Sequence, residues 1–433
     1  MTRGTKIVLA MTGTLLVFVA ALFFTLYGGD GEDAEGRLAA MLSEGKLPAV
    51  SAGLPMLPSP SPFSSEPEPQ NSQSENRTAA AVALKNESEE REVRSFTLAA
   101  AGSVSVPRAI REAARSRSSF DFSTAFLGFG ACLKDTELAL CTLETLTDEG
   151  QSFDATNAPE AILDTLKTAG FTLVSIASEH MLDRDYTGLD VTLSALSSRG
   201  IEAVGVREET EEIPGCMVLL SGIQTAVLGY TYGLDEACPA GEDARKAVPL
   251  LSEDEIRRDI MHARANGAEA VILLVHWGVK NRDQAPESIR ALALRLAEAG
   301  ADVILGAHSG VVQPCERLKV TRADGRECEA FVCYSLGNLL SDARADENAA
   351  GMVLRLPVEY DPVSQLLHFG AYSATPTYIA RQEEEGKTIW RLVEADSEAA
   401  LSALTPLQRE AAYRAVSRIR SVFESDPKGE EEP

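Results

Sequence analysis

Short apolar runs alternate with longer amphipathic segments along the middle of the chain. The apolar runs cover residues 96–101, 138–143, 171–176, 226–228, 270–275 and 303–305. Such runs are typical of strands buried on both faces of a sheet. The amphipathic segments each end immediately before a glycine, as helices commonly do, and cover residues 159–169, 189–199, 252–266 and 286–299. This alternation predicts an α/β domain.

The pattern changes after residue 331, where strands predominate. Apolar and alternating runs cover residues 331–340, 352–360, 366–374 and 389–395, and a last amphipathic stretch covers residues 397–423. No internal repeat is present in the sequence. We therefore expect one α/β domain over residues 95–396, followed by a C-terminal helix and an acidic tail over residues 397–433.

The N-terminal segment has the character of a membrane anchor. Residues 7–27 carry no charge and are about as long as a helix that crosses a bilayer. Arg3 and Lys6 precede the run and four acidic residues follow it, which favours an N-terminus inside and a domain outside the cytoplasm. A cleaved signal peptide is the alternative, but no small-x-small site directly follows the run. Residues 1–29 are thus predicted to be a cytoplasmic stub and an uncleaved transmembrane helix that places the protein in the cell membrane.

Between the anchor and the domain, residues 30–94 are rich in Pro, Ser and Glu. The stretch LPSPSPFSSEPEPQNSQSEN at 57–76 contains few apolar residues. Segments of this composition cannot bury enough apolar surface to fold, so a disordered linker is predicted.

Charge and cysteine content limit the partners and the compartment. The chain of 433 residues has a formal net charge of −25, which argues against nucleic acid as a partner. Its seven cysteines fit an oxidising compartment, where disulfides persist. Cys315 and Cys328 flank a predicted hairpin with its turn at Asp324-Gly325, and they are the preferred pair. The alternatives are Cys132–Cys141, Cys216–Cys238, or seven free thiols.

Three of the five histidines directly follow predicted strands. They are His180, His276 and His308, and they come from three separate segments. Because ligands bind at the carboxyl ends of strands in open α/β sheets, we expect these imidazoles at one edge. They predict a metal or phosphate site, with Zn, Fe or Mn as the metal. His262 lies within a predicted helix and His368 in a late strand, and both are interpreted as structural.

Carboxylates occur at the same predicted edge. Glu179 precedes His180, Asp183 follows it by three residues, and Glu144 ends a strand. Each could complete a coordination shell or transfer a proton, and each could equally be a solvated loop acid or a helix cap. Nucleophile-elbow, P-loop and dinucleotide-binding motifs are missing from the sequence, which argues against those enzyme classes.

Taken in order, the strand-end motifs resemble those of the CapA family of poly-γ-glutamate capsule proteins. The motifs are TLE at 142–144, SEH at 178–180, HWG at 276–278, GAHSG at 306–310 and YSLGN at 334–338. This resemblance implies the four-layer α/β/β/α sandwich of calcineurin-like metallophosphatases. It also implies metal ligands among His180, His276, His308, Glu144 and Glu179, with catalytic roles for His180, Glu179 and Asp183.

Three departures from the family pattern weaken the implied site. Ser103 stands where the family has a metal-binding Asp, Gly310 replaces the second His of its His-x-His motif, and Glu179 replaces an Asn. The Asp and the second His are lost as ligands, whereas Glu179 offers a carboxylate where the family has an amide and could substitute in part. Such a site is expected to hold one divalent metal (Mn, Zn or Fe) or none.

The resemblance therefore predicts a capsule or envelope-polymer protein with a degenerate site. Its expected partners are the membrane and an anionic polymer of the poly-γ-glutamate type, or the machinery that synthesises or exports that polymer. Arg184, Lys280 and Arg282 lie near the motifs and could offset the acidic charge of the domain. The alternative is an active metal-dependent hydrolase or phosphoesterase that uses His180, His276 and His308 on an envelope polymer.

Overall fold

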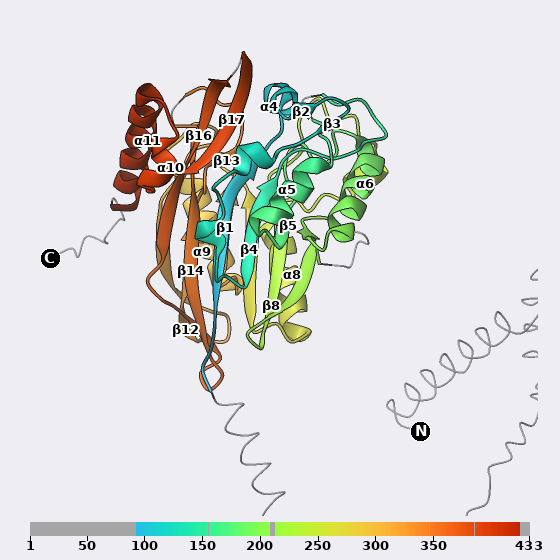
Figure 1. Ribbon diagram of the computed structural model, residues 1–433. Coiled ribbons are helices and arrows are strands. Elements are labelled where there is room, and N and C mark those ends of the chain that lie inside the picture. The colour runs from blue at the N-terminus through green and yellow to red at the C-terminus, as the bar shows by residue number, and fades with distance from the viewer. Residues whose placement is uncertain (1–91, 155, 208–212, 346, 385, 425–433) are drawn as a thin grey trace, which may run out of the picture. The chain divides into compact units, whose positions relative to one another are not determined.

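The computed structural model describes residues 92–424 except residues 155, 208–212, 346 and 385. The predicted anchor at 7–27 and nearly all of the linker at 30–94 lie outside the described residues. Among the described residues, no helix is both long enough and apolar enough to span a bilayer. The described part is a mixed α/β structure, as the alternating pattern predicts (Figure 1).

Two large β-sheets form the centre of the domain. The first has the order β17 (Lys387–Glu394), β16 (Ser373–Glu384), β14 (Ala350–Asp361), β1 (Arg94–Val104), β4 (Leu138–Leu143), β5 (Leu173–Ser175) and β6 (Glu202–Val204), with β13 (Asn338–Leu340) paired to β1 and β15 (Leu366–Phe369) paired to β14. The second has the order β11 (Cys315–Thr321), β12 (Glu327–Cys333), β10 (Val303–Ala307), β9 (Ala270–His276), β8 (Ile223–Thr231) and β7 (Gly215–Leu220). A short ribbon joins β2 (Arg115–Ser116) to β3 (Ser119–Phe120).

Eight helices and two 3₁₀ turns surround the sheets in the described part of the chain. They are α4 (Arg108–Ala113), α5 (Ala161–Ala169), α6 (Asp185–Ser198), α7 (Glu242–Arg245), α8 (Glu253–Ala265), α9 (Glu287–Ala299), α10 (Glu398–Ser402) and α11 (Pro406–Glu424), together with the 3₁₀ turns η1 (Ser123–Phe126) and η2 (Ala131–Leu133). Helices α5 and α6 pack on the first sheet, and α8 and α9 pack on the second.

Alternation along β1 shows how the layers are built. Leu98 and Ala100 belong to a core cluster shared with the second sheet, whereas Ala99 and Ala101 face the cluster beneath α5 and α6. Because successive side chains of a strand point to opposite faces, one strand supplies both layers. Helices α10 and α11 join the cluster between the sheets, so the single C-terminal helix expected from the sequence is two helices that pack on the core.

Two glycines allow the 334–338 segment to lie against both sheets. A Cβ atom on Gly102 would come within 2.1 Å of the carbonyl oxygen of Gly337, and one on Gly306 within 1.9 Å of the carbonyl oxygen of Tyr334. Any side chain at these positions would force the backbone apart. The close approach holds together the strand ends that carry the candidate site.

The preferred cysteine pair is wrong. In the β11–β12 hairpin, Cys315 lies opposite Cys333, and Cys328 lies opposite Val320. Cys315 and Cys328 are therefore several residues apart along the strands, beyond the reach of a disulfide. The described residues contain no disulfide bond.

Candidate metal centre

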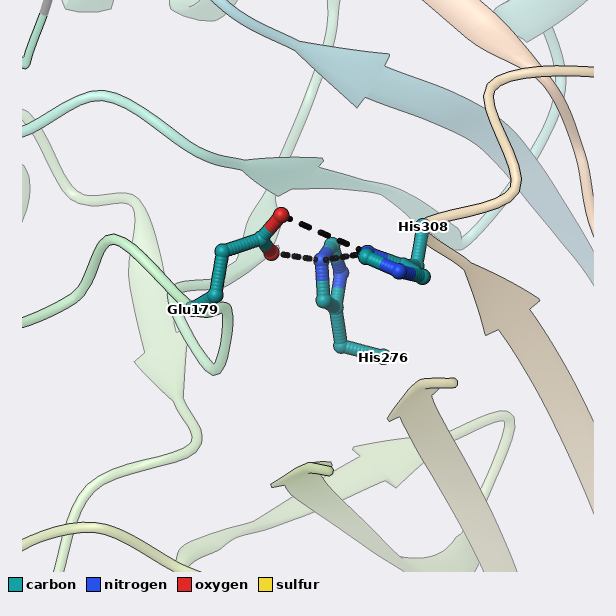
Figure 2. Close-up of side chains that lie close together, drawn as sticks. All are labelled: Glu179, His276 and His308. Atoms are coloured by element: carbon teal, nitrogen blue, oxygen red, sulfur yellow. Dashed lines mark hydrogen bonds and ion pairs between the residues drawn. The ribbon is translucent and has the colours of Figure 1, made fainter. Parts of the chain in front are cut away.

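Glu179, His276 and His308 meet at the carboxyl ends of the central strands. Their potential ligand atoms all lie within 4.8 Å of one another. His276 is the last residue of β9, His308 follows β10, and Glu179 lies in the loop after β5 (Figure 2). In the described part of the chain, this is the one group of three or more such side chains that meets in this way.

The carboxylate of Glu179 contacts both imidazoles of the cluster. Nε2 of His276 forms a hydrogen bond with Oε2 of Glu179, and Nδ1 of His308 lies 3.4 Å from Oε1. Burial by itself raises the pKa of Glu179, but the hydrogen bonds from His276 and His308 outweigh burial and hold the pKa well below its usual range. Glu179 is therefore a buried anion, the form that binds a cation.

His308 adopts an unusual backbone conformation. Its φ angle is +93°, a value that residues other than glycine rarely adopt. Neighbouring hydrogen bonds fix the segment, since Trp277 N donates to Ala307 O at 3.2 Å and Asn281 N donates to Ser309 O at 2.8 Å. Strain of this kind is typical of functional sites, where the surrounding structure enforces it.

The second nitrogen of His276 shows how the cluster suits a metal. His276 is 1% exposed, and its Nδ1 has no hydrogen-bond partner among the described residues. The nearest carboxylate oxygen, Oε1 of Glu144, lies 3.9 Å away. Histidine ligands commonly direct their second nitrogen toward a carboxylate that orients the ring. One carboxylate and two imidazoles form a ligand set that Zn, Fe and Mn accept. Glu144 is not part of this set, but lies near the second nitrogen of His276.

His180 lies beside the cluster and not within it. Its Nδ1 lies 2.9 Å from Oδ2 of Asp183, and its Nε2 lies 3.8 Å from Oε1 of Glu179. The hydrogen bond with Asp183 raises the pKa of His180 above its ordinary value, against the opposing effect of burial. The structure thus brings two of the three predicted histidines together, while the third forms a pair with Asp183.

Lys280 lies close to the carboxylate of Glu179. Its Nζ atom lies 3.1 Å from Oε1 of Glu179, and 62% of its side chain is exposed. The mobile ammonium of an exposed lysine can leave a carboxylate when a stronger cation arrives. Lys280 therefore balances the charge of Glu179 without closing the site.

The sequence patterns did not identify Tyr232 as a site residue. Its ring centroid lies 4.7 Å from that of His308, and it stacks on His276 with an interplanar angle of 13°. Tyr232 is 48% exposed, and burial of the rest raises its pKa. It directly follows β8, so the strand-end rule that identified the histidines would also have found it.

Two of the three positions that depart from the family pattern, Ser103 and Gly310, supply no ligand. Ser103 is 2% exposed and lies opposite Asn338 in the β1–β13 pair. Gly310 has a φ of +69°, and a Cβ atom there would come within 3.2 Å of Nδ2 of Asn348. Nδ2 of Asn338 donates to Gly310 O at 3.2 Å and to Asn348 O at 2.9 Å. The side chains around Gly310 are therefore the neutral amides of Asn338 and Asn348, which offer no charged ligand.

Comparison with known proteins defines the class of protein that this fold and site represent. The model of the family described as "Bacterial capsule synthesis protein PGA_cap" matches residues 97–343. That stretch is more than half of the chain and includes every residue of the candidate metal centre. The protein therefore belongs to the bacterial PGA_cap capsule synthesis family.

Two curated relatives carry CapA names. The capsule biosynthesis protein CapA of Bacillus anthracis is 28% identical over 193 residues, which are 43% of this chain and 44% of the relative. The PGA biosynthesis protein CapA of Bacillus subtilis strain 168 is 24% identical over 238 residues, which are 54% of this chain and 59% of the relative. The matched regions thus span about half the length of these relatives.

Two solved structures match this chain at low sequence identity and with low TM-scores. A novel phosphatase from Mycoplasma pneumoniae is 11% identical with a TM-score of 0.36, covering 66% of this chain and 94% of the phosphatase. A sulfate thiohydrolase from Thermus thermophilus is 14% identical with a TM-score of 0.34, covering 65% of this chain and 43% of the thiohydrolase.

Proposed function

We propose that this protein takes part in the synthesis or export of an anionic cell-envelope polymer of the poly-γ-glutamate type. The family match over residues 97–343 carries the proposal, because it includes Glu179, His276 and His308. Both curated relatives are named for capsule or PGA biosynthesis. The partners of the protein would be the polymer itself or the machinery that makes it.

In this proposal the folded domain works outside the cytoplasm. Its support is the uncharged run at 7–27, with basic residues before it and acidic residues after it. An uncleaved anchor would keep the domain at the membrane surface, where a polymer emerges. Edman sequencing of the mature protein tests this: an N-terminus beyond residue 29 would show that a signal peptide had been removed.

The Glu179–His276–His308 cluster supports a second candidate, a metal-dependent hydrolase or phosphoesterase. These three residues would hold one divalent cation (Mn, Zn or Fe), which would act as a Lewis acid on the scissile bond. Within the chain, Asp183 holds the His180 ring by Nδ1 and leaves Nε2 facing the Glu179 carboxylate. His180 is thereby placed to move a proton at Nε2.

Ser103 and Gly310 favour the first candidate over the second. Two-metal sites need bridging and terminal ligands from several strands, and neither residue can provide one. A single cation can still fix the geometry of the loops or bind one anionic group of a polymer. A degenerate, single-cation site within a polymer-handling protein accounts for both the retained ligands and the missing ones.

Genetic complementation tests the proposed function. A strain that lacks the gene would be complemented with the wild-type gene, with His276→Ala, and with His368→Ala, which alters an exposed histidine of β15. We expect the wild type and His368→Ala to restore the polymer, measured as glutamate released by acid hydrolysis, and His276→Ala to fail. Unchanged polymer in the deletion strain would refute the proposed function.

A further inference from the structure

A hollow of about 500 Å³ opens at the end of the domain where α4 and the β16–β17 strands meet. Figure 1 shows α4 beside the end of β17. The segment that follows β13 completes the wall. The charged residues that line this hollow are Glu112, Arg115, Asp342, Arg344, Arg381 and Lys387. Its volume is in the range of natural ligand sites.

The hollow is cationic, although the protein is strongly acidic. Four basic side chains line it against two carboxylates, whereas the whole chain carries a net charge of −25. Arg115 is paired with Glu112 at 2.9 Å, and Arg381 with Glu383 at 2.9 Å. Three lining groups form no ion pair within the described part of the chain: the cations Arg344 and Lys387, and the carboxylate of Asp342. The unpaired groups of the hollow thus carry a net positive charge that a ligand can meet.

Trp390 forms the buried part of the wall of the hollow. It lines the hollow and is 5% exposed. Its buried Nε1–H group has no acceptor among the described residues. Buried polar groups in proteins are nearly always hydrogen-bonded, so an orphaned donor beside a hollow calls for an explanation. Nε1 itself is enclosed by protein atoms, so the indole ring would have to turn toward the hollow before a ligand oxygen could accept this hydrogen bond.

One chain segment connects the hollow to the candidate metal centre. Arg344 lies in the segment between β13 and β14, which also contains Asn348. Nδ2 of Asn348 donates to Oδ1 of Asn281 at 2.8 Å and to Gly310 O at 3.1 Å. Gly310 is two residues from His308. The same segment therefore borders both sites.

We propose that this cationic hollow binds the carboxylates of an extended anionic polymer and guides the polymer to the candidate metal centre. The proposal rests on the proposed function, because it takes the polymer class from it. Guanidinium and ammonium groups bind carboxylates through charge-assisted hydrogen bonds, and the acidic body of the domain repels the polymer elsewhere. Arg344 and Lys387 are the residues that select this path.

A binding measurement on the full-length protein in detergent micelles tests the inference. The probe is a fluorescein-labelled oligomer of γ-linked glutamate, followed by fluorescence anisotropy at several salt concentrations. Arg344→Glu with Lys387→Glu should raise Kd by on the order of tenfold, because two attractive charges become repulsive. The matched control is Arg258→Glu with Lys134→Glu, two exposed cations outside the hollow, which should change Kd by less than about twofold.

Other outcomes would overturn the inference. Equal weakening by both double variants would mean that only the overall charge matters. Binding of wild-type protein to vesicles with anionic lipid headgroups, without binding to the oligomer, would assign the hollow to a lipid. If the wild-type protein does not bind the oligomer while the gene deletion still abolishes the polymer, the inference fails and the proposed function stands. Thermal unfolding of every variant confirms that the folded state is intact.

Discussion

Nδ1 of His308 lies 3.2 Å from Nε2 of His276, and both imidazoles contact the carboxylate of Glu179. The three side chains come from three separate segments of both sheets, and two of them are almost fully buried. Burying an anion between two imidazoles is costly unless each charge has a partner. These contacts therefore show that the fold positions the three potential ligands before any cation binds. The first two predictions below follow from this arrangement.

The first prediction distinguishes the metal ligands of the cluster from the neighbouring His180. His180→Ala should leave the affinity for Zn²⁺ or Mn²⁺ within about threefold, because His180 lies outside the cluster and contacts Asp183. Glu179→Gln should weaken the affinity by at least about tenfold, because a carboxylate ligand is lost. Isothermal titration calorimetry of the full-length protein measures both. A larger loss in His180→Ala than in Glu179→Gln would contradict the arrangement.

A second prediction concerns the strained backbone at His308. His308→Ala and His308→Gly remove the same imidazole, but only glycine adopts a φ of +93° without strain. The glycine variant should be more stable to unfolding than the alanine variant by ~1 kcal/mol. Urea denaturation followed by circular dichroism measures the difference. An alanine variant as stable as the glycine variant would show that the site is not strained.

The third prediction concerns a buried ion pair far from the site. Asp302 is 2% exposed, with Oδ2 2.6 Å from Nη2 of Arg264, and it also binds Arg322. Asp302→Ala leaves two guanidinium groups without their carboxylate and should lower the free energy of unfolding by ~3–5 kcal/mol. Asp243→Ala, which breaks a fully exposed ion pair with Lys246, should lower the free energy of unfolding far less, because solvent screens that pair. Similar losses in the two urea titrations would contradict this account.

The fourth prediction follows from the register of β11 and β12. Cys315 lies opposite Cys333, and the hydrogen bond from Tyr334 N to Pro314 O (3.1 Å) makes the cysteines a non-hydrogen-bonded pair. Such pairs have Cα atoms about 4.5 Å apart, within disulfide range. Refolding with oxidised glutathione should therefore link Cys315 to Cys333, as seen by mass spectrometry of peptides.

A matched variant checks the cysteine prediction. Cys328→Ser should leave the Cys315–Cys333 link intact, because Cys328 lies opposite Val320. A Cys315–Cys328 peptide in the wild type would contradict the register. This variant also shows whether the partly exposed Cys328 competes for oxidation.

The sequence predicted the strand ends well and the details of side-chain pairing poorly. Histidines after β9 and β10 could be located because apolar runs mark buried strands, and parallel strands deliver their ends to one edge. His180 escaped the same logic, since its ring pairs with Asp183 in the turn that follows β5. The end of a strand fixes the backbone position of a residue, but local hydrogen bonds determine the direction in which its side chain points.

The cysteine pair failed for a similar reason. The predicted turn at Asp324-Gly325 agrees with the hairpin, in which Arg322 N bonds to Arg326 O at 3.0 Å. Register then follows from the turn, and it places Cys315 across from Cys333. Proximity along the chain suggested Cys328, but pairing across a hairpin depends on equal distances from the turn.

Metal content of the purified full-length protein tests the central claim most directly. The protein is reconstituted with Mn²⁺, Zn²⁺ or Fe²⁺, and excess metal is removed. Inductively coupled plasma mass spectrometry should then find about one equivalent of metal per chain in the wild type. His276→Ala and Glu179→Gln should lose it, while His368→Ala, an exposed histidine, should keep it. A wild-type protein without metal, or a His276→Ala variant that retains a full equivalent, would contradict the claim that Glu179, His276 and His308 form a cation site.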